Sequence, residues 1–122
     1  MIQRLLPLLL AGLLSTPALA DENQPEHFSG KPAGTMSEAV ANASEANQEL
    51  AELLDGELSD ADMAEVHRLS YTMENALARI HEEVYQLEGT LEEVHLGSEA
   101  FDRERVRTNG EAYLEGMAPL LD

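Results

Sequence analysis

The residues of this chain that could do chemistry are four histidines and 24 carboxylate side chains. His67, His81 and His95 follow one another at intervals of 14 residues, and each comes directly after an apolar residue. Fourteen residues of α-helix rise about 21 Å, so these three side chains cannot share one metal ion within a helix. The spacing is typical of the flank of a packed helix, where amphipathic side chains rest against a neighbour. His67 and His81 each lie four residues before a tyrosine, Tyr71 and Tyr85, which they can contact across one turn.

One short stretch has the donor types of a metal site. Glu92, His95, Glu99 and Asp102 follow at steps of three, four and three residues, which places them on one face if the helix continues that far. Glu92 and His95 also match the Glu-x-x-His pair of carboxylate-bridged di-iron bundles, but those sites need two such pairs and two further glutamates. We predict no cofactor. The alternative is a zinc, iron or copper ion held by Glu92, His95 and Glu99, with His27 as a further ligand.

Other kinds of chemistry have little support. The chain has no cysteine, which excludes thiol catalysis, thiolate metal sites and covalent haem attachment. It has no glycine-rich phosphate loop and no nucleophile elbow. We therefore predict that the protein is not an enzyme.

The charge of the chain restricts its partners. Seven basic residues against 24 acidic ones give a formal net charge of −17. Such a charge disfavours nucleic acid and anionic membrane surfaces. It suits cationic partners, or simply keeps the protein soluble in a salty compartment.

The N-terminus predicts export. Arg4 precedes an apolar run from Leu5 to Leu14, and Ala18-Leu19-Ala20 is the pattern that signal peptidase cleaves. The alternative is a retained membrane anchor, but the run is too short to span a bilayer. We predict a signal peptide over 1–20 with cleavage after Ala20, a periplasmic location, and no membrane association afterwards.

Periodicity defines the elements that follow. Prolines and glycines over 21–34 predict an extended, mobile lead-in, and 35–122 form a single helical domain. Thr35 and Glu38 form a capping box for a first helix, which ends at Gly56. The apolar stripe of this helix consists of Met36, Val40, Ala43, Leu50 and Leu54, and Asn47 occupies its one polar position.

A second helix begins at Ser59, which can cap it. Its apolar positions alternate at steps of three and four with one polar member, Ser70, and so form a heptad seam. They are Met63, Val66, Ser70, Met73, Leu77, Ile80, Val84, Leu87, Leu91 and Val94. Gly89 permits a stop and restart, but the seam keeps its phase there, which favours one long helix. A last helix runs from about Arg103 to Leu121.

These helices predict an all-α fold: an antiparallel helical hairpin or three-helix bundle with one long central helix. Folding the shorter helices back on the central one places Asn47 opposite Ser70 and Gly110 opposite Leu87. A layer of two helices leaves apolar surface uncovered, so we expect a homodimer that completes a four-helix bundle.

Several segments together resemble a family of small exported proteobacterial proteins catalogued only as a domain of unknown function. The segments are His27 to Ala33, Leu58 to His67, Glu92 to Leu96 and Gly110 to Leu114. The resemblance implies export and helicity and brings no activity with it. The chain is more loosely similar to periplasmic four-helix cytochromes, but it lacks their Cys-x-x-Cys-His motif and a histidine on the seam that could pair with a terminal methionine as haem ligands. We predict a small, acidic, helical periplasmic protein that serves as a non-enzymatic interaction or scaffold module with an unknown protein partner; the alternative is a periplasmic metal-binding protein that uses the Glu/His stripe.

Overall fold

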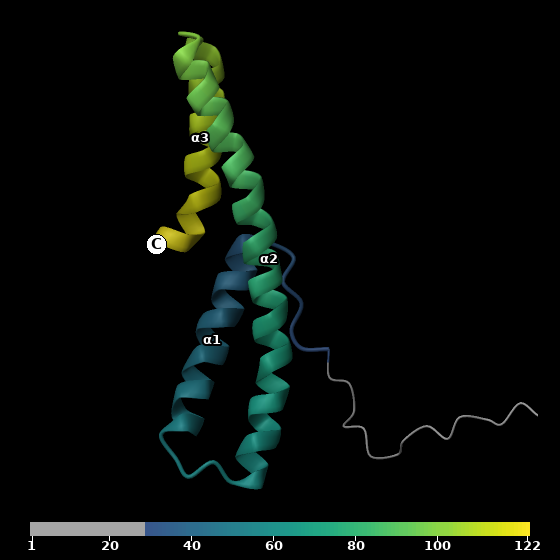
Figure 1. Cartoon of the computed structure of the whole chain (residues 1–122). Helices are drawn as coiled ribbons and strands as arrows, with labels where there is room; N and C mark the ends of the chain where they lie inside the picture. The colour runs from purple at the N-terminus through teal and green to yellow at the C-terminus, as the bar shows by residue number, and fades with distance from the viewer. Residues whose placement is uncertain (1–28) are drawn as a thin grey trace, which may run out of the picture.

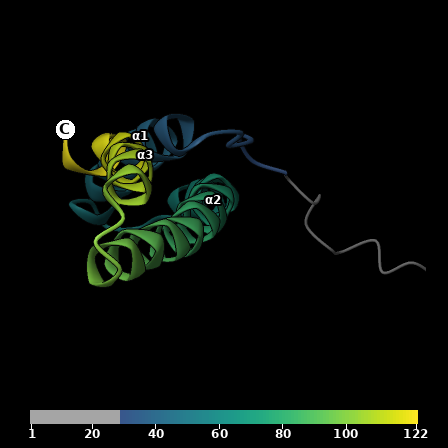
Figure 2. The ribbon, with the colours of Figure 1, turned by 90° about the horizontal axis from the view of Figure 1, so that it is seen from above.

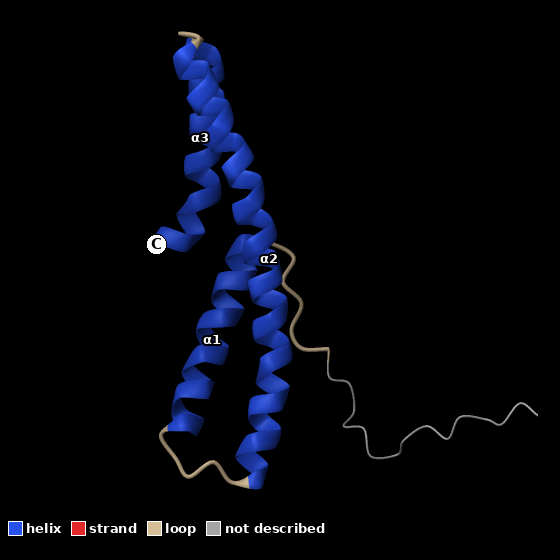
Figure 3. Ribbon diagram, viewed as in Figure 1, coloured by secondary structure: helices blue, strands red, loops and turns tan. Residues whose placement is uncertain are grey.

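The computed structural model describes residues 29–122, which contain three α-helices and no strand. They are α1 (Met36–Leu54), α2 (Asp60–Glu99) and α3 (Arg103–Leu121) (Figures 1 and 3). The all-helical prediction is confirmed. The signal peptide, its cleavage after Ala20, residues 21–28 of the lead-in, and His27 lie outside the described residues.

The long helix α2 is the axis of the fold. Its 40 residues extend for about 60 Å. α1 runs antiparallel along its N-terminal half and α3 along its C-terminal half, and the two short helices meet near the middle (Figure 1). Both lie on the same side of α2 when the molecule is seen from above (Figure 2). The predicted three-helix arrangement is therefore present, but over most of its length α2 has only one helical neighbour.

The helix starts follow from local hydrogen bonding. Ser59 and Asp62 form a complete capping box at α2, in which the Ser59 amide donates to the Asp62 carboxylate at 2.8 Å. At α1, the Thr35 hydroxyl accepts from the Glu38 amide at 3.2 Å. The Glu38 carboxylate, however, accepts from the Gly34 amide at 2.7 Å and not from Thr35, so the predicted capping box is closed one residue earlier.

α2 passes through Gly89 without a break, as the phase of the seam indicated. A Cβ at Gly89 would meet no atom within 4 Å. The glycine thus faces open space rather than a neighbouring backbone.

The residues of α1 and α2 lie opposite one another along the helix axes nearly as predicted, but the buried side of each helix differs from the prediction. Arg68 pairs with Glu49 at 3.5 Å, close to the level at which Asn47 was placed opposite Ser70. Asn47 is nevertheless exposed, and the Ser70 hydroxyl donates to the Val66 carbonyl of its own helix at 2.8 Å. The predicted polar pair is wrong because both helices are rotated by about one residue, which buries Ala46 and Leu69 in place of Asn47 and Ser70. The buried positions of α2 that face α1 are Leu69, Thr72 and Ala76.

The α2–α3 register also differs from the prediction. A Cβ at Gly110 would meet nothing within 4 Å, whereas one at Gly116 would overlap the Leu87 side chain. α2 continues to Glu99 and only three residues separate it from α3. This tight turn moves α3 along α2 by several residues relative to the predicted pairing.

The apolar core is thin. The buried apolar side chains are Met36, Ala39, Ala46, Leu69 and Ala76, and α3 contributes none. Small residues dominate this set because they let α1 and α2 approach closely. Many large apolar side chains therefore remain in contact with solvent.

Candidate interaction surface

The outer face of α2, which we define by Met63, Leu77 and Leu91 and the histidines that follow them, carries an uncovered apolar stripe. The side chains of Met63, Leu77 and Leu91 are 54%, 62% and 46% exposed. They follow one another at 14 residues, about 3.9 helical turns, and so return to nearly the same side of α2. All three belong to the predicted seam, of which the structure covers only one edge.

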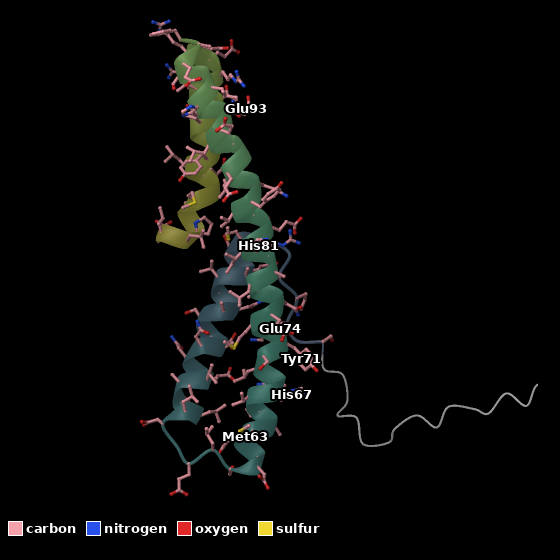
Figure 4. The ribbon with its side chains drawn as sticks, viewed as in Figure 1. Met63, His67, Tyr71, Glu74, His81 and Glu93 are labelled. Carbon is pink, nitrogen blue, oxygen red and sulfur yellow. The ribbon has the colours of Figure 1, made fainter. Side chains whose placement is uncertain are left out.

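Each member of this stripe is followed four residues later by a histidine. His67, His81 and His95 are all exposed, and His67 and His81 can be located along α2 in Figure 4. The outer face therefore repeats an apolar–histidine pair three times.

One of the two predicted histidine–tyrosine contacts is confirmed. The rings of His67 and Tyr71 meet edge to face with centroids 5.1 Å apart. Within residues 29–122, no corresponding contact joins His81 to Tyr85.

The candidate metal stripe is brought together only in part. His95 Nε2 lies 3.2 Å from Glu99 Oε1. Asp102 instead caps α3, accepting from the Arg105 amide at 3.1 Å, because α2 ends before it. Across residues 29–122, no three histidine, aspartate or glutamate side chains converge, Glu92 included. His27 lies outside this part of the chain.

Residues 29–34, predicted as part of a mobile lead-in, are extended but attached to α2. The Lys31 backbone amide donates to the Thr72 hydroxyl at 3.0 Å. The Asn75 side-chain amide donates to the Ser29 and Lys31 carbonyls at 2.8 and 3.0 Å. Arg79 Nε donates to the Ala33 carbonyl at 3.0 Å. The segment is thus part of the packed structure, which its proline and glycine content did not indicate.

Arg68 is the electrostatic link between α1 and α2. Its guanidinium pairs with Glu65 on its own helix and with Glu49 on α1. The hydrogen bond from Arg68 lowers the pKa of Glu65 below its ordinary value, and the same hydrogen bond raises the pKa of Arg68. Arg105 links α3 to α2 in the same way, through Glu93 at 2.7 Å.

The turn between α2 and α3 holds a feature that sequence reasoning missed. An open cavity of about 500 Å³ lies there, and Phe101, Arg103, Val106 and Arg107 are among the residues that line it. The signal in the sequence was the alternation of three arginines, 103, 105 and 107, in a chain with only seven basic residues.

These features define an all-helical protein with a thin apolar core and exposed apolar side chains along α2, in which residues 29–122 bring together no group of three metal-ligating side chains. In that same part of the chain, no helix has the length and apolar character needed to cross a membrane. The whole chain, residues 1–122, matches the family model DUF6746, a family of unknown function, and the protein belongs to that family. No curated protein and no solved structure matches it.

Proposed function

We propose that this protein is an exported, non-enzymatic interaction module that acts as a homodimer through the outer face of α2. The observation that carries the proposal is the exposure of Met63, Leu77 and Leu91 along one side of a helix that has a single neighbour over most of its length. Half-buried seam residues such as Val66, Ile80 and Val84 lie between them, and an apolar row of this kind suits a protein contact. Export rests on the N-terminal pattern that ends at Ala20. N-terminal sequencing of protein from the periplasm tests it, with Asp21 expected as the first residue.

The spacing of the stripe suits pairing with a second, antiparallel copy. Residue numbers 63, 67, 77, 81, 91 and 95 are symmetric about position 79. A two-fold axis there places Leu77 opposite His81 of the second copy, and Met63 opposite His95 of the second copy. Each apolar side chain then packs against an imidazole ring. α2 and its copy, each with its short helices, form a bundle with helices on both sides.

Light scattering after size-exclusion chromatography of residues 21–122 tests the dimer. Leu77→Glu puts a carboxylate beside the proposed two-fold axis and is expected to give a monomer. Leu114→Glu is the matched control, because Leu114 is 68% exposed on α3 and lies outside the stripe. Since both copies are strongly acidic, we expect added salt to strengthen the dimer. A folded wild-type monomer at about 100 μM contradicts the proposal, as does a dimer that survives Leu77→Glu.

The orientation has its own test, since the chain has no natural cysteine. In the antiparallel dimer, two copies of position 63 lie about 48 Å apart along the axis, whereas positions 63 and 95 lie side by side. Mixing Met63→Cys with His95→Cys is therefore expected to give a heterodisulfide under oxidation. Met63→Cys alone is expected to stay uncrosslinked, and its rapid self-crosslinking would indicate parallel pairing.

The second candidate function is metal binding, and the pair His95–Glu99 at 3.2 Å favours it. A structural or catalytic zinc site takes at least three protein ligands. These two donors therefore need further ligands from His27 or from another molecule. Metal analysis of protein purified from the periplasm tests this candidate, with bound zinc, iron or copper lost in His95→Ala as the supporting result.

A further inference from the structure

The turn that joins α2 to α3 has an unusual residue at its tightest point. After Glu99, the Asp102 amide donates to the Gly97 carbonyl at 2.9 Å and the Phe101 amide donates to the Ser98 carbonyl at 3.2 Å. This pair of bonds is the Schellman pattern, whose central residue adopts a left-handed conformation and is usually glycine. Here the position is Phe101, at φ 56°.

The phenylalanine gains nothing from packing to offset this conformation. Phe101 is 81% exposed, the highest value among the large apolar residues of 29–122. A bulky L-residue in the left-handed region is strained, and strain of this kind gathers at functional sites. The chain thus holds an aromatic ring in solvent at a cost to its own stability.

The ring borders the open cavity of about 500 Å³, a volume suited to a small organic molecule. Gly97 is part of its wall, and a Cβ there would come within 3.1 Å of the Val106 side chain. Phe101 and Val106 supply apolar contacts on the two sides of the turn.

Two arginines that form no ion pair within residues 29–122 also line the cavity. Lys31, Arg68, Arg79 and Arg105 each lie within 4.0 Å of a carboxylate. Among the basic residues of 29–122, the two without such a partner are Arg103 and Arg107, and both line this cavity. They are four residues apart on α3 and hence neighbours on its surface. Two adjacent guanidinium groups suit a carboxylate or phosphate.

We propose that this cavity binds a small amphiphilic anion, with an aromatic or apolar body against Phe101 and Val106 and a carboxylate or phosphate held by Arg103 and Arg107. The protein as a whole is strongly acidic and repels anions. The one carboxylate in the cavity lining, Asp102, accepts a hydrogen bond from the Arg105 amide, so the arginine pair is a local reversal of charge. The site lies on the turn, and none of the residues that line it belongs to the stripe on α2.

Fluorescence titration with anilinonaphthalene sulfonate tests the proposal, and N-phenylnaphthylamine serves as the neutral analogue with the same ring body. We expect one saturable site for the anion and binding at least about tenfold weaker for the neutral analogue. The double variant Arg103→Gln/Arg107→Gln is expected to bind the anion about tenfold more weakly or worse. Lys31→Gln, which removes an exposed positive charge elsewhere, is expected to change little.

Phe101→Gly separates the ligand contact from fold stability. Glycine suits the left-handed position, so we expect the melting temperature to rise by about 4–8 °C while the dye affinity falls. Leu77→Gln controls for dye bound to the outer face of α2 and is expected to bind as the wild type does. Unchanged dye binding in Phe101→Gly, or loss of binding in Leu77→Gln, overturns the proposal.

Displacement of the dye identifies the anion. Naphthoate and naphthyl phosphate share the ring body and differ in the charged group. Stronger displacement by one of them assigns the preferred group. Failure of both to displace the dye overturns the proposal.

Discussion

The absence of a side chain at Gly30 lets residues 29–34 lie directly against the backbone of α2, and Gly30→Ala tests this close approach. Gly30 has a φ of 67°, and a Cβ there would lie 2.6 Å from backbone atoms of Tyr71 and Thr72. Backbone in the middle of α2 cannot move aside. The alanine variant therefore has to lift residues 29–31 away from the helix, while the Arg79–Ala33 bond remains.

The expected loss of stability can be worked from the contacts. The left-handed conformation costs an alanine about 1 kcal/mol. Lifting the segment breaks the Lys31–Thr72 hydrogen bond and the two bonds from Asn75, each worth about 1 kcal/mol. Because lifting the segment relieves the strain, the two costs do not add. We expect a loss of about 2–3 kcal/mol, or a melting temperature lower by about 10 °C or more.

Thermal and urea unfolding followed by circular dichroism measure the loss, with Gly89→Ala as the matched control. Gly89 has open space around it, so the same substitution there gains about 1 kcal/mol of helix propensity. Hydrogen exchange of the Lys31 amide, protected in the wild type and fast in Gly30→Ala, locates the effect. The reasoning is refuted if Gly30→Ala unfolds within about 0.5 kcal/mol of the wild type.

Three further predictions follow from single sites. Asn47→Ala is expected to change the free energy of unfolding by less than about 0.5 kcal/mol, because the side chain is exposed. A larger loss of stability in urea unfolding would instead support a buried Asn47–Ser70 pair. The hydrogen bond from the Ser59 hydroxyl lowers the pKa of Asp62 below its ordinary value of 3.8, so this contribution to stability is present above that pH and is lost as the pH falls through the lowered value. The difference in melting temperature between wild type and Ser59→Ala is therefore expected to shrink at low pH, and a constant difference down to about pH 2 would contradict it. Calorimetric titration with zinc is expected to give no dissociation constant below about 10 μM, since His95 and Glu99 supply only two donors; tighter binding that His95→Ala removes would favour the metal-binding candidate.

The sequence by itself determined the helical class, the number of helices and most of their ends. Steps of three and four residues are a property of the helix, and side chains such as Ser59 satisfy free amides within four residues of chain. The continuity of α2 through Gly89 was predictable for the same reason, because the phase of a seam is a local quantity. That apolar surface of α2 would stay exposed was also predictable, since a layer of two helices leaves part of a heptad seam uncovered.

The tertiary structure alone decided which edge of that seam is buried, how far α3 slides along α2, and where residues 29–34 lie. The apolar stripe of α2 is wide, so hydrophobicity is nearly unchanged when the helix turns by one residue. Close approach through Ala46 and Ala76 then selects one rotation over the other. The strained position of Phe101 arises in the same way. Only three residues join α2 to α3, and the backbone of this tight turn requires a left-handed residue at position 101 whatever its side chain.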